Sequence, residues 1–242
     1  MFLPPLEGLL LIALSAYVIC LLLQRVAGAV GLMLFQSLSI IIANIQAMKV
    51  VSLPFLDCPI AMGTEIMMVS FFASDLLCEH YGAPMARKGV MLSFISYGLF
   101  TCMMLLTTHI QLAPSETAFF QQSHDAITHL FTPAPAFFIA SLVALAISQL
   151  ADIWIFDKLR KKDGAKRLGI RTFLSTTIGS LLDTIVFSVL AWIVFAPTPL
   201  PLYVVLTSYI GGAFGVRLIL SLFQAPLMYV ARTMMRPRGV AA

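Results

Sequence analysis

The stretch MMVSFFASDLLCEHYGAPMARKGVMLSF, residues Met67–Phe94, holds two apolar runs joined by a short polar turn. Asp75 and Glu79 stand at the end of the first run, and Arg87 and Lys88 stand at the start of the second. Residues four apart lie on the same face of a helix, so the two carboxylates share one side of the first run. The stretch predicts two neighbouring helices connected by a tight basic turn.

The composition of the whole chain places these helices in a membrane. Of the 242 residues, 60% are hydrophobic and 11% are charged, and the mean hydropathy is +0.97. A soluble domain carries roughly 25% charged residues. Because a membrane span needs about 20 apolar residues, the chain has room for about six or seven spans with short loops.

Apolar segments follow one another along the entire chain. Seven of them can be marked: Leu6–Gln24, Ala29–Met48, Ile60–Cys78, Gly89–Thr108, Pro135–Phe156, Phe173–Phe195 and Leu202–Ala231. We therefore predict an all-α integral membrane protein, a bundle of about seven transmembrane helices forming a single domain over residues 1–242. The last segment is long, and Pro226 lies within it, so we expect a tilt or a break there.

The distribution of Lys and Arg predicts the orientation of this bundle. Thirteen of the 15 basic residues fall in one set of alternate connections, whereas the other set holds Lys49 alone. The long connection from His109 to Pro133 has no Lys or Arg. Since basic residues near span ends stay on the cytoplasmic side, the amino terminus is expected outside and the carboxyl terminus in the cytoplasm.

Several classes of function are disfavoured by the sequence. The basic residues form no stripe on a folded domain, so we expect no nucleic-acid partner. The motifs H-E-x-x-H, G-x-S-x-G and the P-loop are absent, and His124 and His129 fit no established metal pattern, so we expect no enzyme activity, metal or cofactor. Without a CxxC pair, the cysteines are expected to be buried free thiols: Cys20, Cys58, Cys78 and Cys102.

Charged residues inside the apolar segments are the candidates for function, because an unpaired charge in hydrocarbon costs several kcal/mol. Asp183 and Arg217 fall at comparable depth in the last two segments, and a pair between them is the simplest way to keep both charges. Asp152 lies near the inner end of its segment, with Gln149 one turn earlier. Each also has a structural alternative: a helix-to-helix pair for Asp183, and a solvated helix end for Asp75, Glu79 and Asp152.

These polar groups suggest a carrier for a small solute. Asn44, Gln149, Asp152 and Asp183 offer buried donors and acceptors that suit a planar, hydrogen-bonding molecule better than a bare ion. A carboxylate accepts two hydrogen bonds from a purine-like base, and Trp154 and Phe187 are the expected stacking partners. Hydrogen bonding between helices is the alternative explanation for Asn44.

Four stretches of the sequence resemble one known family. They are SDLLCEHYGAPMARKGV, SQLADIWIFDKLR, STTIGSLLDTIVFSVLAW and NIQAMK. NIQAMK comes first along the chain, and the other three follow in the order given. Taken in this sequence order, the four stretches resemble the queuosine precursor transporters, also called the vitamin uptake transporter family. Relative to the six-span core of that family (about 29–231), the first segment (about 6–24) is an additional span, and Arg217 stands where some relatives are expected to have Lys.

The resemblance implies import of 7-deazaguanines, namely the 7-cyano and 7-aminomethyl compounds or queuine, across a bacterial inner membrane for salvage of the tRNA base queuosine. The matching positions imply a binding site of Asn44, Asp75, Glu79, Arg87, Gln149, Asp152, Asp183 and Thr184, to which the residues themselves add Trp154 and Arg217. Partners would be the solute, the lipid bilayer and either a second copy or ATPase subunits. Alternatives are a substrate-binding subunit of an energy-coupling-factor importer, or a membrane enzyme acting on lipid or nucleotide head groups.

Overall fold

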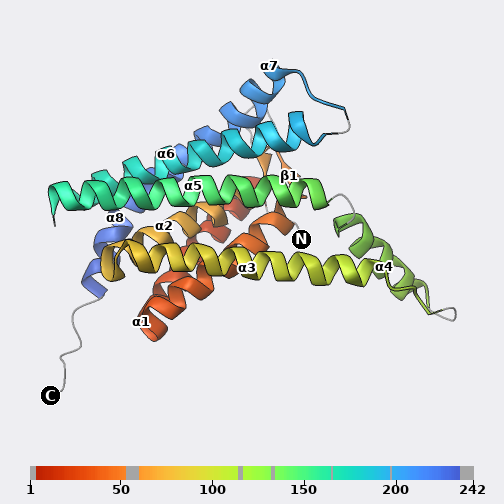
Figure 1. The fold of residues 1–242 in the computed structure, drawn as a ribbon, viewed down its shortest axis with the longest axis horizontal. Coiled ribbons are helices and arrows are strands. Elements are labelled where there is room, and N and C mark those ends of the chain that lie inside the picture. Colours follow the sequence, from red (N-terminus) through yellow and green to blue (C-terminus); the bar gives the residue numbers. More distant parts are fainter. Residues whose placement is uncertain are drawn as a thin grey trace.

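The computed structural model describes residues 4–52, 60–113, 117–131, 134–164, 166–196 and 198–234. Cys58, Arg236 and Arg238, which entered the sequence predictions, lie outside these ranges. The described chain is α-helical apart from one pair of two-residue strands, so the predicted all-α class is confirmed (Figure 1).

Helix α1 (Pro5–Gln46) is a hairpin with two helical arms. The chain reverses at Gly28, whose φ of 58° and ψ of −129° lie outside the helical region. The arms approach so closely that a Cβ added at Gly31 would stand 2.1 Å from the carbonyl oxygen of Leu23. Glycine is therefore required at both positions, and the two arms correspond to the first two predicted segments.

The remaining elements follow α1 in a simple order. They are β1 (Val50–Val51), β2 (Ile60–Ala61), α2 (Thr64–Tyr81), α3 (Ala83–Thr108), α4 (Ala118–Phe131), α5 (Ala134–Asp163), α6 (Leu168–Val189), the π-helical η1 (Leu190–Val194), α7 (Leu202–Val204), the π-helical η2 (Val205–Gly212) and α8 (Ala213–Met234). The strands pair antiparallel. Helices α5 and α6 run side by side and form the most extensive helix contact (Figure 1).

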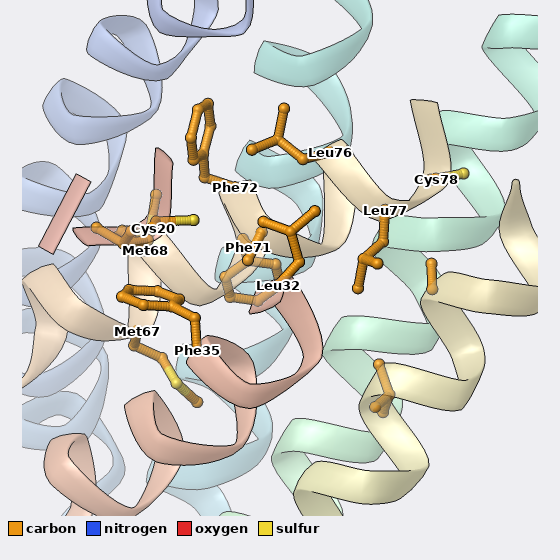
Figure 2. Close-up of a cluster of buried hydrophobic side chains, with 14 of the residues drawn as sticks. Cys20, Leu32, Phe35, Met67, Met68, Phe71, Phe72, Leu76, Leu77 and Cys78 are labelled. Carbon is orange, nitrogen blue, oxygen red and sulfur yellow. The ribbon is translucent and has the colours of Figure 1, made fainter. Parts of the chain in front are cut away.

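Helix α2 is the centre of the bundle. Every residue of α2 from Thr64 to Cys78 is buried, and the helix packs against α1, α3, α5, α6 and α8. Figure 2 shows Met68 and Phe71 of α2 beside Phe35 and Leu32 of α1, and Phe72 contacts Tyr17 of α1 with ring centroids 5.3 Å apart. The opening stretch of the sequence thus supplies the helix around which the others are arranged.

The membrane-spanning character of the helices agrees with the sequence. Among the described residues, five helices are long and apolar enough to cross a membrane, with the 42-residue α1 counted once. Helix α2, which carries three carboxylates, is not among them. Each of the seven predicted segments has a helical counterpart, but the number of crossings, their orientation and the division into an added span and a core stay predictions.

Three local predictions can be compared with the structure. The expected break in the last segment is not seen: Leu202–Met234 is one helical stretch with π-helical η2 near its start, and α8 continues through Pro226, so only the tilt stays a prediction. The connection from His109 to Pro133 was not among the predicted helical segments, but it contains α4, a helix of 14 residues with none of them buried. Cys20 and Cys78 are buried free thiols as predicted, whereas Cys102 is exposed on α3, so the prediction was wrong there.

Candidate functional site

A cavity of about 290 Å³ lies between the second arm of α1, α5, α6 and α8, next to the strand pair. Apolar and polar groups share its wall. The lining residues are Ala43, Asn44, Ala47, Val50, Ala61, Met62, Gly63, Thr64, Met67, Ser141, Asp183, Thr184, Phe187, Ser188, Trp192, Ala213 and Arg217. Of the predicted site residues, Asn44, Asp183, Thr184 and Arg217 are therefore brought together.

An ion pair forms the most polar part of the cavity wall. Arg217 Nη1 donates to Asp183 Oδ2 at 2.6 Å and to the carbonyl oxygen of Ser180 at 3.2 Å. The side chains of Arg217 and Asp183 are 11% and 7% exposed. The predicted pair is thus confirmed, and it joins α6 to α8. Ser148 of α5 adds a third helix by donating to Asp183 Oδ1 at 3.3 Å.

The opposite wall is held by the half-buried Asn44. Its amide donates to the carbonyl oxygen of Ile40 at 2.8 Å, and its Oδ1 accepts a hydrogen bond from Ser141 at 2.8 Å. Two roles were considered for Asn44 from the sequence, a hydrogen bond between helices and a place in the binding site. The structure combines them, because Asn44 links α1 to α5 and also lines the cavity. Thr184 donates to the carbonyl oxygen of Ser180 at 2.8 Å, which fixes its side chain at the cavity surface.

Aromatic rings enclose the cavity at its end near η1. Phe187 and Trp192 line it, and Phe137 of α5 contacts both, with ring centroids 6.5 Å and 5.3 Å away. Trp154 is elsewhere: its side chain is 55% exposed and lies under Lys158 Nζ, 4.6 Å from the ring centre. The prediction of Trp154 as a stacking partner is corrected, and Phe187, the other predicted ring, is in place.

A second polar region lies deeper between α2, α5 and α6, and does not line the cavity. Asp75 and Asp152 are both fully buried there. Ser175 and Thr176 of α6 donate to the two oxygens of Asp75, each at 3.4 Å. Gln149, one turn before Asp152, bonds instead to Gln36 and Ser70 at 3.3 Å each. The expectation that all the predicted groups meet around one cavity is therefore corrected.

An ion-pair cluster around Glu79 lies at one end of this region. Arg171 of α6, 1% exposed, pairs with Glu79 and donates to the carbonyl oxygen of Gly164 at 2.6 Å. Arg160 lies 3.6 Å from Glu79 and donates to the carbonyl oxygen of Cys78 at 2.6 Å. Asp75 and Glu79 were expected among the binding residues, but neither lines the cavity: Asp75 is fully buried beside α6, and Glu79 faces the two arginines. Arg87 is exposed at the start of α3.

Some of these residues had a signal in the sequence and some did not. Thr184, Ser188 and Trp192 repeat every four residues after Ser180, which is the spacing of one helix face. That stripe could have identified Trp192. Arg171 was counted as a loop residue because it follows a run of basic residues, and no sequence pattern distinguishes it from its exposed neighbours. Ser141 likewise had no signal.

Apolar helices around an internal cavity with an ion pair in its wall are the features of a multi-pass membrane transporter. Comparison with known proteins agrees with this class. Residues 61–231 match the family described as "Putative vitamin uptake transporter", and the chain belongs to that family. The resemblance found from the sequence motifs is confirmed. The family description names a transporter and gives no enzymatic activity.

Two bacterial relatives carry a more specific name. A "Probable queuosine precursor transporter" of Bacillus subtilis (strain 168) is 28% identical over 223 residues, covering 92% of each chain. A protein of the same name from Haemophilus influenzae is 30% identical over 130 residues, covering 54% of this chain and 51% of its own. No solved structure matches the chain significantly. The similarity to bacterial proteins fits a multi-pass protein of a bacterial membrane.

Proposed function

We propose that this protein imports queuosine precursors, the 7-deazaguanine bases, and that they bind in the cavity beside Asp183 and Arg217. The printed names of two relatives support the substrate class. The cavity supports it independently, because it combines a carboxylate, a guanidinium and aromatic rings in one small space. The ion pair is the observation on which the proposal depends most.

The chemistry of a deazaguanine suits this wall. Its ring N–H and amino group are adjacent donors, which a carboxylate such as Asp183 accepts side by side. Its carbonyl oxygen is an acceptor for the guanidinium of Arg217, and the flat base can stack on Phe187 or Trp192. A volume of about 290 Å³ is near the lower end for small-molecule pockets, roughly 300–1,000 Å³, which favours a single base over a nucleoside.

The arrangement also suits alternating access. The cavity borders the strand pair, which the distribution of basic residues predicts to be on the outer side. The region below it is closed by the Glu79, Arg160 and Arg171 cluster, on the predicted cytoplasmic side. We infer that the structure resembles an outward-facing state, in which a solute reaches Asp183 from outside while the inner path is shut.

The proposal is tested in bacterial cells that can neither make nor import the precursors but can insert them into tRNA. The chain is expressed in these cells, each 7-deazaguanine is supplied in turn, and queuosine in tRNA is measured. We expect uptake with the unchanged chain, and loss of at least tenfold, about 1.4 kcal/mol, with Asp183→Asn or Arg217→Gln. Asp125→Asn, an exposed carboxylate on α4, is the matched control and should transport normally.

Two outcomes would contradict the proposal. One is failure of the unchanged chain to restore queuosine with any precursor although it is present in the membrane. The other is normal uptake by both cavity variants. If uptake appears when ATPase subunits of an energy-coupling-factor importer are supplied, and is absent without them, the substrate assignment stands and the alternative of a binding subunit replaces the independent carrier.

A further inference from the structure

Asp75 and Asp152 form a buried carboxylate pair between three helices. Asp75 projects from α2 and Asp152 from α5, and both side chains are fully buried. Both carboxylates meet α6: Ser175 and Thr176 donate to the two oxygens of Asp75 at 3.4 Å each, and Gly179, one turn after Ser175, lies against the Cβ of Asp152. Neither oxygen of Asp152 completes a hydrogen bond within the described part of the chain.

The neighbouring cations are occupied elsewhere. Arg171 is paired with Glu79, and Arg160 also faces Glu79, so no direct ion pair to Asp75 or Asp152 is found among the described residues. Cys78 of α2 and Arg171 of α6 interact electrostatically with Asp75. Asp157 and Arg160 of α5 lie near Cys78, and Glu79 of α2 pairs with Arg171. Asp157 is itself paired with Lys161 at 2.6 Å.

The two buried carboxylates favour uptake of a proton. Glu79 faces both Arg160 and Arg171, so neither Asp75 nor Asp152 has an ion-pair partner of its own among the described residues. Two adjacent carboxylates in a low-dielectric interior do not both remain ionised, since a buried carboxylate without a paired cation takes up a proton instead. The unpartnered hydroxyl of Thr172, also fully buried, lies on the α6 face that carries Ser175.

The pair is mechanically connected to the cavity. On α5, Ser148 contacts Asp183 of the cavity, and Asp152 follows one turn later. On α6, Gly179 lies against Asp152, where an added Cβ would be 3.0 Å from that of Asp152, and Asp183 follows one turn later. Four residues of helix span about 6 Å. The cavity ion pair and the buried carboxylates are thus successive contacts of the same two helices.

We propose that Asp75 and Asp152 share one proton, which is the coupling ion for solute import by this protein. The proposal rests on the proposed function. A proton from the outer side binds the pair as a carboxylic acid O–H, and the protonated pair allows α5 and α6 to move relative to α2. When the inner cluster opens, the O–H bond breaks and the proton leaves to the cytoplasm with the solute. Each cycle moves one proton and one molecule of the base, which is neutral in the case of the 7-cyano compound.

The test uses the purified full chain in liposomes and labelled 7-cyano-7-deazaguanine. A gradient of about one pH unit, acid outside, supplies about 1.4 kcal/mol per proton, so one-to-one coupling accumulates the base about tenfold. A protonophore should abolish accumulation. Asp152→Asn and Asp75→Asn should keep exchange of labelled for unlabelled base but lose accumulation. Asp163→Asn, at the end of α5, is the matched control and should accumulate normally.

The outcomes separate this inference from the proposed function. If the unchanged protein neither binds nor exchanges any 7-deazaguanine, the proposed function fails. If it exchanges the base but accumulates it with a sodium gradient alone, or if both Asn variants accumulate it like the unchanged chain, proton coupling at this pair is wrong. Exchange without accumulation in the Asn variants supports it.

A second measurement covers the case in which the Asn variants do not fold. Infrared spectroscopy of the unchanged protein detects the C=O stretch of a protonated carboxyl group. We expect such a band at neutral pH, and we expect it to change when the base is added and to shift in heavy water. Its absence over the pH range in which transport occurs would overturn the shared proton without any variant.

Discussion

The cavity and the buried carboxylate cluster lie at opposite ends of the contact between α5 and α6. They are built from the same helices but differ in how their charges are balanced. In the cavity, Asp183 and Arg217 form a matched pair with one side open to a solute. In the cluster, Arg160 and Arg171 both face Glu79, and within the described residues no salt bridge reaches Asp75 or Asp152. A balanced pair suits recognition of a neutral molecule, whereas an unbalanced pair suits binding of a proton.

The largest effect is expected when one partner of the Asp183–Arg217 ion pair is removed. Arg217→Ala leaves Asp183 with a charge that is nearly buried and unpaired, and we expect a loss of about 3–5 kcal/mol in the free energy of unfolding. Thermal unfolding in detergent measures this change. The double variant Asp183→Asn/Arg217→Gln removes both charges and should recover most of the stability but not base binding. If the double variant were as unstable as Arg217→Ala, the loss of stability would not come from the unpaired charge of Asp183.

The next largest effect is expected when the ion-pair cluster around Glu79 is disrupted. Glu79→Gln removes the charge that faces the buried Arg171, and we expect a loss of about 3 kcal/mol in stability because a buried guanidinium loses its partner. Affinity for the base, measured by calorimetry, should change less than about twofold, or about 0.4 kcal/mol. Asp157→Asn, which disrupts the exposed pair with Lys161, is the control and should cost about 0.5 kcal/mol or less. A strong loss of affinity in Glu79→Gln would show that the two regions are not separate.

A medium effect comes from the contact between the two regions. A Cβ at Gly179 would lie 3.0 Å from both the Cβ of Asp152 and the Cε1 of Phe71. We expect Gly179→Ala to cost about 1–3 kcal/mol through overpacking and to slow transport more than binding. Gly98→Ala on α3, where a Cβ meets nothing within 4 Å, should instead stabilise by up to about 1 kcal/mol. A harmless Gly179→Ala would mean that α5 and α6 can separate there freely.

The smallest effect is expected when an aromatic residue is replaced. Comparing Trp154 with Phe187 tests which of the two belongs to the binding cavity. Trp154→Leu should leave base affinity unchanged, because the ring lies outside beside Lys158. Phe187→Leu, in the cavity wall, should lower affinity by about 1–3 kcal/mol if the ring stacks on the base. Fluorescence titration of both variants measures the difference. A loss in Trp154→Leu and none in Phe187→Leu would return the stacking role to the residue first predicted.

Sequence reasoning recovered the parts of this molecule that hydrophobicity and charge determine. Asp183 and Arg217 could be paired because they are ionisable residues at similar depth. The arms of α1 could be separated because Arg25 and Gly28 interrupt an apolar run. The family followed from motifs whose polar residues recur at helical spacing.

The parts that sequence reasoning missed depend on which face of each helix packs against another helix. An almost uniformly apolar segment has no periodic pattern that indicates this face. Trp154 is the example. It lies two residues after Asp152, about 200° around the helix, so its outward direction was implied once Asp152 faced inward. The burial of Arg171 and the helical state of α4 had no comparable signal, because a basic residue near a loop and a polar connection between spans are ordinary features.

The bend at Gly28 has a consequence for how the protein is made. Because Gly31 of the second arm lies against Leu23 of the first, contact between the arms can begin as soon as the chain has passed the bend, before the second arm is complete. On the seven-span prediction, we expect the two arms to enter the bilayer together, as one unit. Arg25 is the sole Lys or Arg of α1, so on the seven-span prediction one side chain at the fold of this unit biases which compartment receives it.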